Sequence, residues 1–135
     1  MQKHRHPRPT VLIVDDESAM RKLVAKFLNR EGYETLTAKD GPDALKLYAL
    51  KQSEIDVTLL DAMMPGMDGL ETMVAIREID PDAKFILSSG FPIEAFAESN
   101  LSGAFLGKPY TLSDLKNVVT GALLKNTLAG SGLPM

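Results

Sequence analysis

Polar side chains that bind metal ions or phosphate stand directly after the short apolar runs of this sequence. They are Asp15, Asp16, Asp61, Ser89 and Lys108. Each taken singly could be a helix cap or a solvated surface group. Carboxylates gathered at the end of buried strands, however, repel one another and need a compensating cation. The spacing therefore predicts a site in which three acids share a cation.

Magnesium chemistry explains this set of residue types. Oxygen-only donors with room for water suit Mg²⁺, which commonly takes one or two carboxylates together with phosphate oxygens. Lys108 would balance the third acid and hold a phosphate oxygen, while Ser89 would donate a hydrogen bond to another. A carboxylate beside Mg²⁺ and a lysine is arranged to attack phosphorus, which gives an aspartyl phosphate. We therefore predict that Asp61 is phosphorylated.

Strand-like and helix-like segments alternate from Thr10 onward. The expected strands are residues 10–15, 33–38, 56–61, 83–89 and 103–107. The expected inward-facing helix residues are Met20, Leu23, Val24, Phe27 and Leu28; Ala44, Leu47 and Tyr48; Leu70, Met73 and Val74; and Leu112, Leu115, Val119 and Ala122. Five consecutive βα units predict an α/β fold, a parallel sheet between two layers of helices. In such sheets ligands bind outside the carboxyl ends of the strands, where all the polar residues above are placed.

Composition narrows the class of protein. The chain has 135 residues, 44% of them hydrophobic and 24% charged, which is typical of one globular domain. A net charge of −3 argues against direct nucleic-acid binding. Cysteine is absent and no segment has the length of a membrane span, so we expect a cytoplasmic protein that does not bind membranes. Within the chain we expect a disordered tail at 1–9, the domain at 10–126 and a flexible tail at 127–135.

Four motifs give the sequence a family resemblance. They are "VLIVDDE", "LLDAMMPGMDG", "SSG" and "GKPY", in this order and spacing. Over about residues 10 to 125 the chain resembles the receiver domain of response regulators in two-component signalling. The resemblance implies a flavodoxin-like (βα)5 three-layer sandwich with strand order 2-1-3-4-5. The stretch between Ser89 and Lys108 is shorter than in well-studied receivers, so we expect a short fourth helix, as in receivers attached to hybrid histidine kinases.

The resemblance also assigns roles to single residues. It implies that Asp61 is the phosphoacceptor, that Asp15, Asp16, Asp61 and the backbone carbonyl of Met63 bind Mg²⁺, and that Lys108 senses the phosphate. The bond to Pro109 is expected to be cis. Ser89, next to Gly90, matches the switch hydroxyl better than Ser88 does, and Phe105 matches the aromatic switch position. Met63 and Phe91 match the positions that flank the approach of water to the acyl phosphate, and both are bulky and apolar.

The implied function is that of a phosphoacceptor in a phosphorelay. The donor would be a sensor histidine kinase or a histidine phosphotransfer protein, and the domain would catalyse only its own phosphorylation and dephosphorylation. The downstream partner is not identified by the sequence, which is compatible with a homodimer. The sequence fits either a stand-alone receiver or a receiver from a longer protein.

Three alternative functions fit the sequence less well. A haloacid-dehalogenase-type phosphatase needs a second acid two residues after its nucleophile, where this chain has Met63. A flavodoxin-type flavin carrier needs a hydroxyl- and glycine-rich loop after the first strand, where this chain has acids that would repel phosphate. A pseudo-receiver that only binds partners is disfavoured by the complete set of acids, hydroxyl and lysine, but it stays open.

Overall fold

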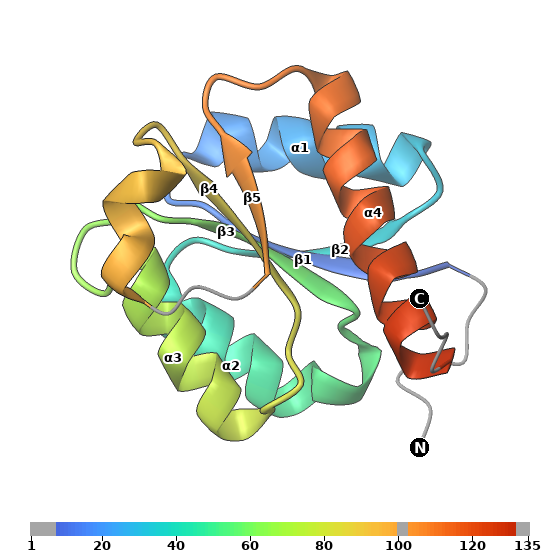
Figure 1. The fold of residues 1–135 in the computed structure, drawn as a ribbon, viewed down its shortest axis with the longest axis horizontal. Helices are drawn as coiled ribbons and strands as arrows, with labels where there is room; N and C mark the ends of the chain where they lie inside the picture. Colours follow the sequence, from blue (N-terminus) through green and yellow to red (C-terminus); the bar gives the residue numbers. More distant parts are fainter. Residues whose placement is uncertain (1–7, 100–102, 132–135) are drawn as a thin grey trace.

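The computed structural model describes residues 8–99 and 103–131 and shows a three-layer α/β fold (Figure 1). The strands are β1 (Thr10–Val14), β2 (Glu34–Ala38), β3 (Val57–Asp61), β4 (Phe85–Ser89) and β5 (Ala104–Gly107). The α-helices are α1 (Ser18–Arg30), α2 (Gly41–Lys51), α3 (Gly69–Ile79) and α4 (Leu112–Ser131). Two 3₁₀ segments complete the described elements, η1 (Gln52–Glu54) and η2 (Ile93–Ser99).

The five strands form one parallel sheet in the order β2-β1-β3-β4-β5, as predicted. All five residues are buried in each of β1, β3 and β4, the three inner strands. A strand that is covered on both faces needs apolar residues at every position, which explains the continuous runs of the sequence. The alternating segment 33–38 provides β2 at one edge of the sheet, where only Ala38 is fully buried.

Side chains that alternate along the strands build two separate cores. One core lies between the sheet and helices α2 and α3, and we call it the α2/α3 core; Leu12, Leu60 and Leu87 belong to it. The other, the α1/α4 core, lies on the opposite face and contains Ile13, Leu59 and Ile86. Figure 1 shows α2 and α3 on one side of the sheet, with α1 and α4 on the other. The sheet therefore separates the two cores and contributes side chains to both.

Local capping fixes where the helices begin. Asp40 accepts a hydrogen bond from the Asp43 N–H, and Pro42 stands in the first turn of α2, where a missing N–H costs little. Thr111 and Asp114 cap α4 reciprocally: Thr111 Oγ1 accepts from the Asp114 N–H, and Asp114 Oδ2 accepts from the Thr111 N–H. This reciprocal pair of hydrogen bonds is a capping box.

The carboxyl-terminal helix is longer than the predicted domain boundary implied. α4 reaches Ser131, beyond residue 126, and the end of the domain at 126 stays a prediction. Residues 132–135 of the predicted flexible tail, and residues 1–7 of the predicted amino-terminal tail, lie outside the described residues. Within the described part of the chain, no helix combines the length and the hydrophobicity that crossing a membrane requires.

The segment after β4 is short, as expected, but it is a 3₁₀ segment. η2 spans Ile93–Ser99, and its backbone departs from helical geometry at Phe96 (φ −111°, ψ 17°). The segment consists of short 3₁₀ turns on either side of this kink, which agrees with the rarity of 3₁₀ runs longer than three or four residues. Phe96 nevertheless lies buried in the α2/α3 core, so one aromatic side chain anchors the segment.

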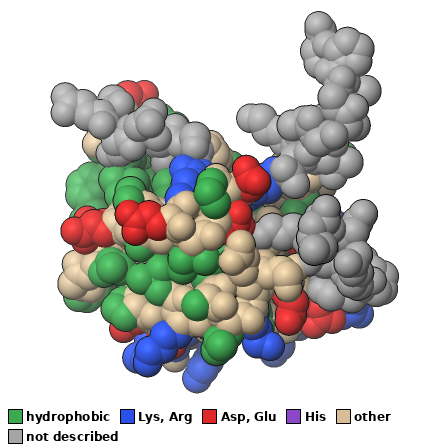
Figure 2. Space-filling model, turned by 90° about the horizontal axis from the view of Figure 1, so that it is seen from below, with side chains coloured by type: hydrophobic (Ala, Val, Ile, Leu, Met, Phe, Trp, Pro, Cys, Tyr) green, Lys and Arg blue, Asp and Glu red, His purple; other side chains and the backbone are tan. Residues whose placement is uncertain are grey.

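Three residues that we expected to face inward are exposed. Leu23 on α1, Val74 on α3 and Leu112 at the start of α4 have exposed fractions of 52%, 61% and 39%. Leu23 precedes the buried Val24 and Val74 follows the buried Met73, and adjacent helix residues point about 100° apart. A helix lying on a sheet buries only one stripe, so these neighbours fall outside it. Figure 2, which views the molecule from below, shows exposed hydrophobic side chains among charged ones on that face.

Thr58 in the middle of β3 should respond to replacement by valine with a gain in stability. It is fully buried, and its Oγ1 has no hydrogen-bond partner among the described residues. Thr58→Val keeps the branched shape and removes the unpaired hydroxyl, so the free energy of unfolding should rise by about 1 kcal/mol.

A matched control lies in α3. Thr72 is equally buried, but its Oγ1 donates to the Asp68 carbonyl oxygen at 2.8 Å. Thr72→Val should therefore lower stability. Urea unfolding measures the change in the free energy of unfolding for both variants. A loss of stability in Thr58→Val would contradict the conclusion that its buried hydroxyl is unpaired.

Candidate functional site

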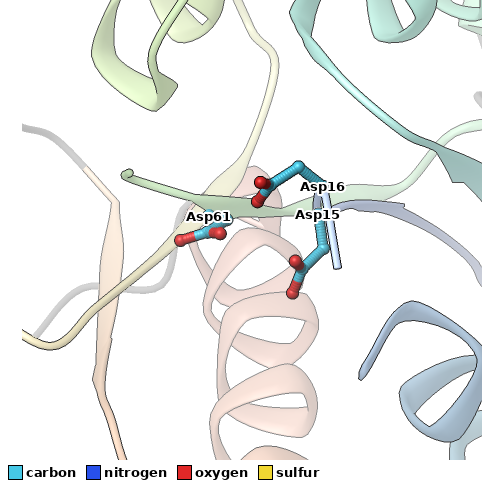
Figure 3. Close-up of side chains that lie close together, drawn as sticks. All are labelled: Asp15, Asp16 and Asp61. Atoms are coloured by element: carbon cyan, nitrogen blue, oxygen red, sulfur yellow. The ribbon is translucent and has the colours of Figure 1, made fainter. Parts of the chain in front are cut away.

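Three carboxylates meet at the carboxyl edge of the sheet. Asp15 and Asp16 follow β1, and Asp61 is the last residue of β3, which pairs with β1. One carboxylate oxygen from each lies within 4.8 Å of the others, and Figure 3 shows the three side chains together. Asp15 and Asp61 are buried while Asp16 is exposed. Oxygen donors this close form a group that could hold a metal ion.

The loop after β1 is held at Asp15 by three hydrogen bonds. The Asp15 N–H donates to the Ala38 carbonyl at 3.2 Å, which ties the loop to the end of β2. Asp15 Oδ1 accepts from the Glu17 N–H at 2.9 Å. The Asp15 carbonyl oxygen accepts from Arg21 Nη1 on α1 at 2.7 Å. The backbone that carries the two acids is therefore fixed before any ligand binds.

Lys108 provides the cation that contacts Asp61. Its N–H donates to the Ser89 carbonyl at 2.7 Å, which places it at the end of β5 beside β4. Its Nζ lies 3.3 Å from Asp61 Oδ1, and the lysine side chain is 25% exposed. Asp61 Oδ1 also accepts from the Met63 N–H at 3.2 Å. The peptide bond between Lys108 and Pro109 is cis, as predicted.

The electrostatics of the site favour an additional cation. Burial raises the pKa of Asp61 above its ordinary value, although Lys108 opposes the shift. Burial also raises the pKa of Asp15, with smaller contributions of the same sign from its neighbouring acids. Tyr110 is half-buried nearby, and burial together with the charges of Asp15 and Asp61 raises its pKa to about 12. Burial therefore makes the ionised form of Asp15 and Asp61 less favourable than it is in water, and an added cation would offset this cost.

The two serines that end β4 differ in their environment. Ser89 is buried, and its Oγ accepts a hydrogen bond from the Phe91 N–H at 2.9 Å. Ser88 pairs with Asp61 in the register of the sheet, and its buried Oγ has no hydrogen-bond partner among the described residues. Because side chains alternate along a strand, Ser89 points to the same face as Leu87, toward the α2/α3 core.

Three apolar residues with predicted roles surround this edge. Phe105 is partly buried against the α2/α3 core, and its ring centroid lies 6.0 Å from that of Phe96. Met63 and Phe91 follow β3 and β4 and are exposed by 55% and 53%. The structure thus brings the predicted acids, Ser89 and Lys108 together at one edge of the sheet, whereas Phe105 lies within β5, paired with Leu87. Sequence reasoning missed Arg21, whose contact with a backbone carbonyl leaves no signature in residue types, and it gave Tyr110 no role within "GKPY".

A comparison with family models decides the class of the domain. Residues 11–120 match the response regulator receiver domain. The chain belongs to this family. The receiver domain therefore accounts for both the strand order and the acidic edge.

Similar proteins include complete receivers and much longer sensor kinases. The chain is 35% identical over 125 residues to the autoinducer 1 sensor kinase/phosphatase LuxN of Vibrio campbellii, covering 91% of this chain but 14% of that protein. It is 32% identical over 112 residues to the sporulation initiation phosphotransferase F of Bacillus subtilis, covering 81% and 89%. The chain thus spans about one seventh of the length of the sensor kinase.

The fold is also that of solved receivers. One is a CheX–CheY–BeF3–Mg²⁺ complex from Borrelia burgdorferi, with a TM-score of 0.77 and 31% identity over 84% of this chain and 87% of that one. This receiver domain is therefore similar, in sequence and in fold, to a protein whose structure was determined with a beryllofluoride and a magnesium ion.

Proposed function

We propose that this receiver domain accepts a phosphoryl group on Asp61, with Mg²⁺, from a histidine kinase or a histidine phosphotransfer protein. One observation carries the proposal: the buried Asp61 carboxylate contacts Lys108 Nζ at 3.3 Å and lies within 4.8 Å of two further carboxylates. Its relatives include sensor kinases and a phosphotransferase, which supports this class of donor.

Magnesium fits the residues at the site. The carboxylates of Asp15, Asp16 and Asp61 are hard oxygen donors, and the Met63 carbonyl is the fourth ligand that the family resemblance assigns. The acids carry more negative charge than Lys108 alone can balance, so a divalent cation would relieve their repulsion. When bound, Mg²⁺ would neutralise negative charge on the phosphoryl oxygens during transfer.

The transfer itself needs only the carboxylate of Asp61 as nucleophile. One of its oxygens forms a bond to phosphorus while the bond between phosphorus and the donor breaks, and the electron pair of that bond leaves with the donor. Lys108 would then exchange its contact with Asp61 for a phosphoryl oxygen, and Ser89 would donate its hydroxyl hydrogen to another. In hydrolysis the oxygen of water attacks phosphorus and the bond between phosphorus and the Asp61 oxygen breaks; its electron pair returns to the carboxylate, and inorganic phosphate leaves with the protons of the water. As a signalling domain, it would catalyse these two steps on itself alone.

Movements of Ser89 and Phe105 would transmit the phosphorylation of Asp61 to the surface around η2. Drawing Ser89 toward the phosphoryl group breaks its hydrogen bond with the Phe91 N–H and releases the start of the segment that leads to η2. Phe105 would turn further inward and displace Phe96, the ring on which η2 is anchored. Phosphate that binds one arrangement better shifts the population toward it, which changes the surface offered to a partner.

Phosphorylation by a small donor tests the proposed function directly. The protein is incubated with acetyl phosphate and Mg²⁺, and intact-mass spectrometry measures the protein mass. We expect a gain of one phosphoryl group that disappears when EDTA is present. No mass gain with acetyl phosphate, and none with a panel of histidine kinases, would favour a partner-binding pseudo-receiver instead.

Asp16→Asn should separate the stability of the metal-free domain from its response to Mg²⁺. Removing one of three clustered charges should raise stability without metal by about 1 kcal/mol, the Coulomb energy of such a pair in water. Saturating Mg²⁺ at a hundredfold excess over Kd should stabilise the wild type by about 2.7 kcal/mol and the variant much less. Thermal melts with and without Mg²⁺ measure both effects.

Glu17→Gln is the matched control, because it removes the adjacent acid that lies outside the cluster of three. It should keep the wild-type response to Mg²⁺. Equal responses in Asp16→Asn and the wild type would remove Asp16 from the metal site.

Met63 and Phe91 should control how long the phosphoryl group persists. Both are apolar and flank the approach of water, and neither can orient a water molecule by hydrogen bonding. Met63→Asn with Phe91→Glu should therefore speed loss of phosphate from Asp61 about tenfold, less than the roughly 10²- to 10⁴-fold that a well-positioned proton-transfer group contributes. Decay is followed by mass after the donor is removed, and Ile93→Glu, an exposed position in the same segment, controls for added charge. Unaltered decay in the double variant would contradict the role.

A further inference from the structure

Arg21 makes a contact at the acid site that the proposed chemistry does not use. It lies in the first turn of α1, where its own N–H donates to the Glu17 carbonyl at 2.9 Å. Its side chain reaches back along the loop, and Nη1 donates to the Asp15 carbonyl oxygen at 2.7 Å in a partly buried position. A guanidinium hydrogen bond of this length is charge-assisted and strong.

The carbonyl that Arg21 holds belongs to the peptide group between Asp15 and Asp16. A peptide group is planar, so fixing the direction of its oxygen also fixes where the two flanking Cα atoms lie, and these are the points from which the two side chains start. Asp15 has two further anchors, at Ala38 and Glu17. Asp16 is exposed, yet its carboxylate belongs to the cluster, so the placement of its Cα by this peptide plane bears directly on the site.

We infer that Arg21 is a positioning residue for the acid pair: it holds the peptide plane between Asp15 and Asp16 so that both carboxylates face one cation. The inference deepens the proposed function and rests on it, because it concerns the same Mg²⁺ site. Hydrogen bonds that orient the ligands of a metal commonly change its affinity by about 10- to 100-fold.

A positioning role and a purely electrostatic role of Arg21 predict opposite changes in Mg²⁺ affinity when Arg21 is replaced. Arg21 carries a positive charge close to a cation site, so removing that charge alone should tighten Mg²⁺ binding. If Arg21 instead orients the ligands, removing it should weaken binding despite the lower repulsion. The sign of the change in Kd therefore distinguishes the two effects.

The experiment measures Mg²⁺ affinity by NMR titration of the intact chain, which needs no phosphorylation. Arg21→Gln should raise Kd about tenfold. Arg21→Lys, which can restore one charged hydrogen bond to the carbonyl, should recover part of that loss. Lys22→Gln removes the same charge from the neighbouring exposed position and should leave Kd unchanged or slightly lower.

A stability control completes the set. Val24 lies on α1 in the α1/α4 core, so Val24→Ala lowers stability without touching the loop. Unchanged or tighter binding in Arg21→Gln overturns the inference, as does an equal loss in Arg21→Gln and Val24→Ala. If the wild type and Asp16→Asn both fail to respond to Mg²⁺, the metal site of the proposed function is itself wrong, and this inference falls with it.

Discussion

Replacing Asp61 with asparagine should abolish phosphate uptake by this domain. The amide has nearly the shape of the carboxylate but is no nucleophile toward phosphorus, and it also removes the negative partner of Lys108. With acetyl phosphate and Mg²⁺ under conditions that modify the wild type fully, intact-mass spectrometry should find no adduct on Asp61→Asn. The fold should persist, because the change relieves the burial of a charge whose pKa is raised by that burial.

A neighbouring acid provides the control for this variant. Asp68 lies in the same β3–α3 loop, caps α3, and is not a member of the acid cluster. Asp68→Asn keeps a residue that caps helices well and should be phosphorylated like the wild type. An adduct on Asp61→Asn equal to that on Asp68→Asn would move the acceptor to another residue.

Gly69→Ala should be among the most destabilising single substitutions in the domain. A Cβ at this position would lie 2.5 Å from the Asp61 carbonyl oxygen and 2.6 Å from Ala62 Cα. Both are backbone atoms at the end of a central strand, so they cannot move aside as a flexible side chain would. We expect a loss of about 3 kcal/mol in the free energy of unfolding, at the upper end of ordinary overpacking. The displaced Asp61 backbone should also slow phosphorylation at temperatures where the variant stays folded.

Replacing a different glycine with alanine should raise the free energy of unfolding. Gly121 lies inside α4, and a Cβ there would meet nothing within 4 Å. Gly121→Ala should therefore stabilise the protein by up to about 1 kcal/mol, the helix-propensity difference between the residues. Urea unfolding of both variants gives the comparison. A Gly69→Ala protein as stable as the wild type would show that α3 can shift away from β3 at little cost.

The strands and the acidic edge could be predicted because each depends on local sequence. Continuous apolar runs require burial on both faces, and parallel strands bring their carboxyl ends to one edge, so Asp15, Asp16 and Asp61 had to meet there. The capping of α4 by Thr111 and Asp114 was equally local. These features needed no knowledge of how the layers pack.

Features set by packing between distant segments escaped prediction. Leu23 and Val74 are apolar and lie next to buried residues, but the width of each helix–sheet contact decides that they are exposed. The 3₁₀ geometry of η2 depends on how Phe96 reaches the core across a short connection. The bond from Arg21 to the Asp15 carbonyl depends on the placement of α1, which residue types do not encode.

The separation of the two cores by the sheet has a consequence for how this domain can evolve. Ser89 and Phe105 point toward the α2/α3 core, while Arg21 lies on α1, on the opposite side of the sheet. Residues that share no partners and lie on opposite sides of a sheet contribute nearly additively to stability. Substitutions that adapt the η2 side to a new target can therefore accumulate without disturbing the loop that carries the acids. One lineage could exchange its output partner repeatedly while Asp15 and Asp16 kept their positions for the metal ion.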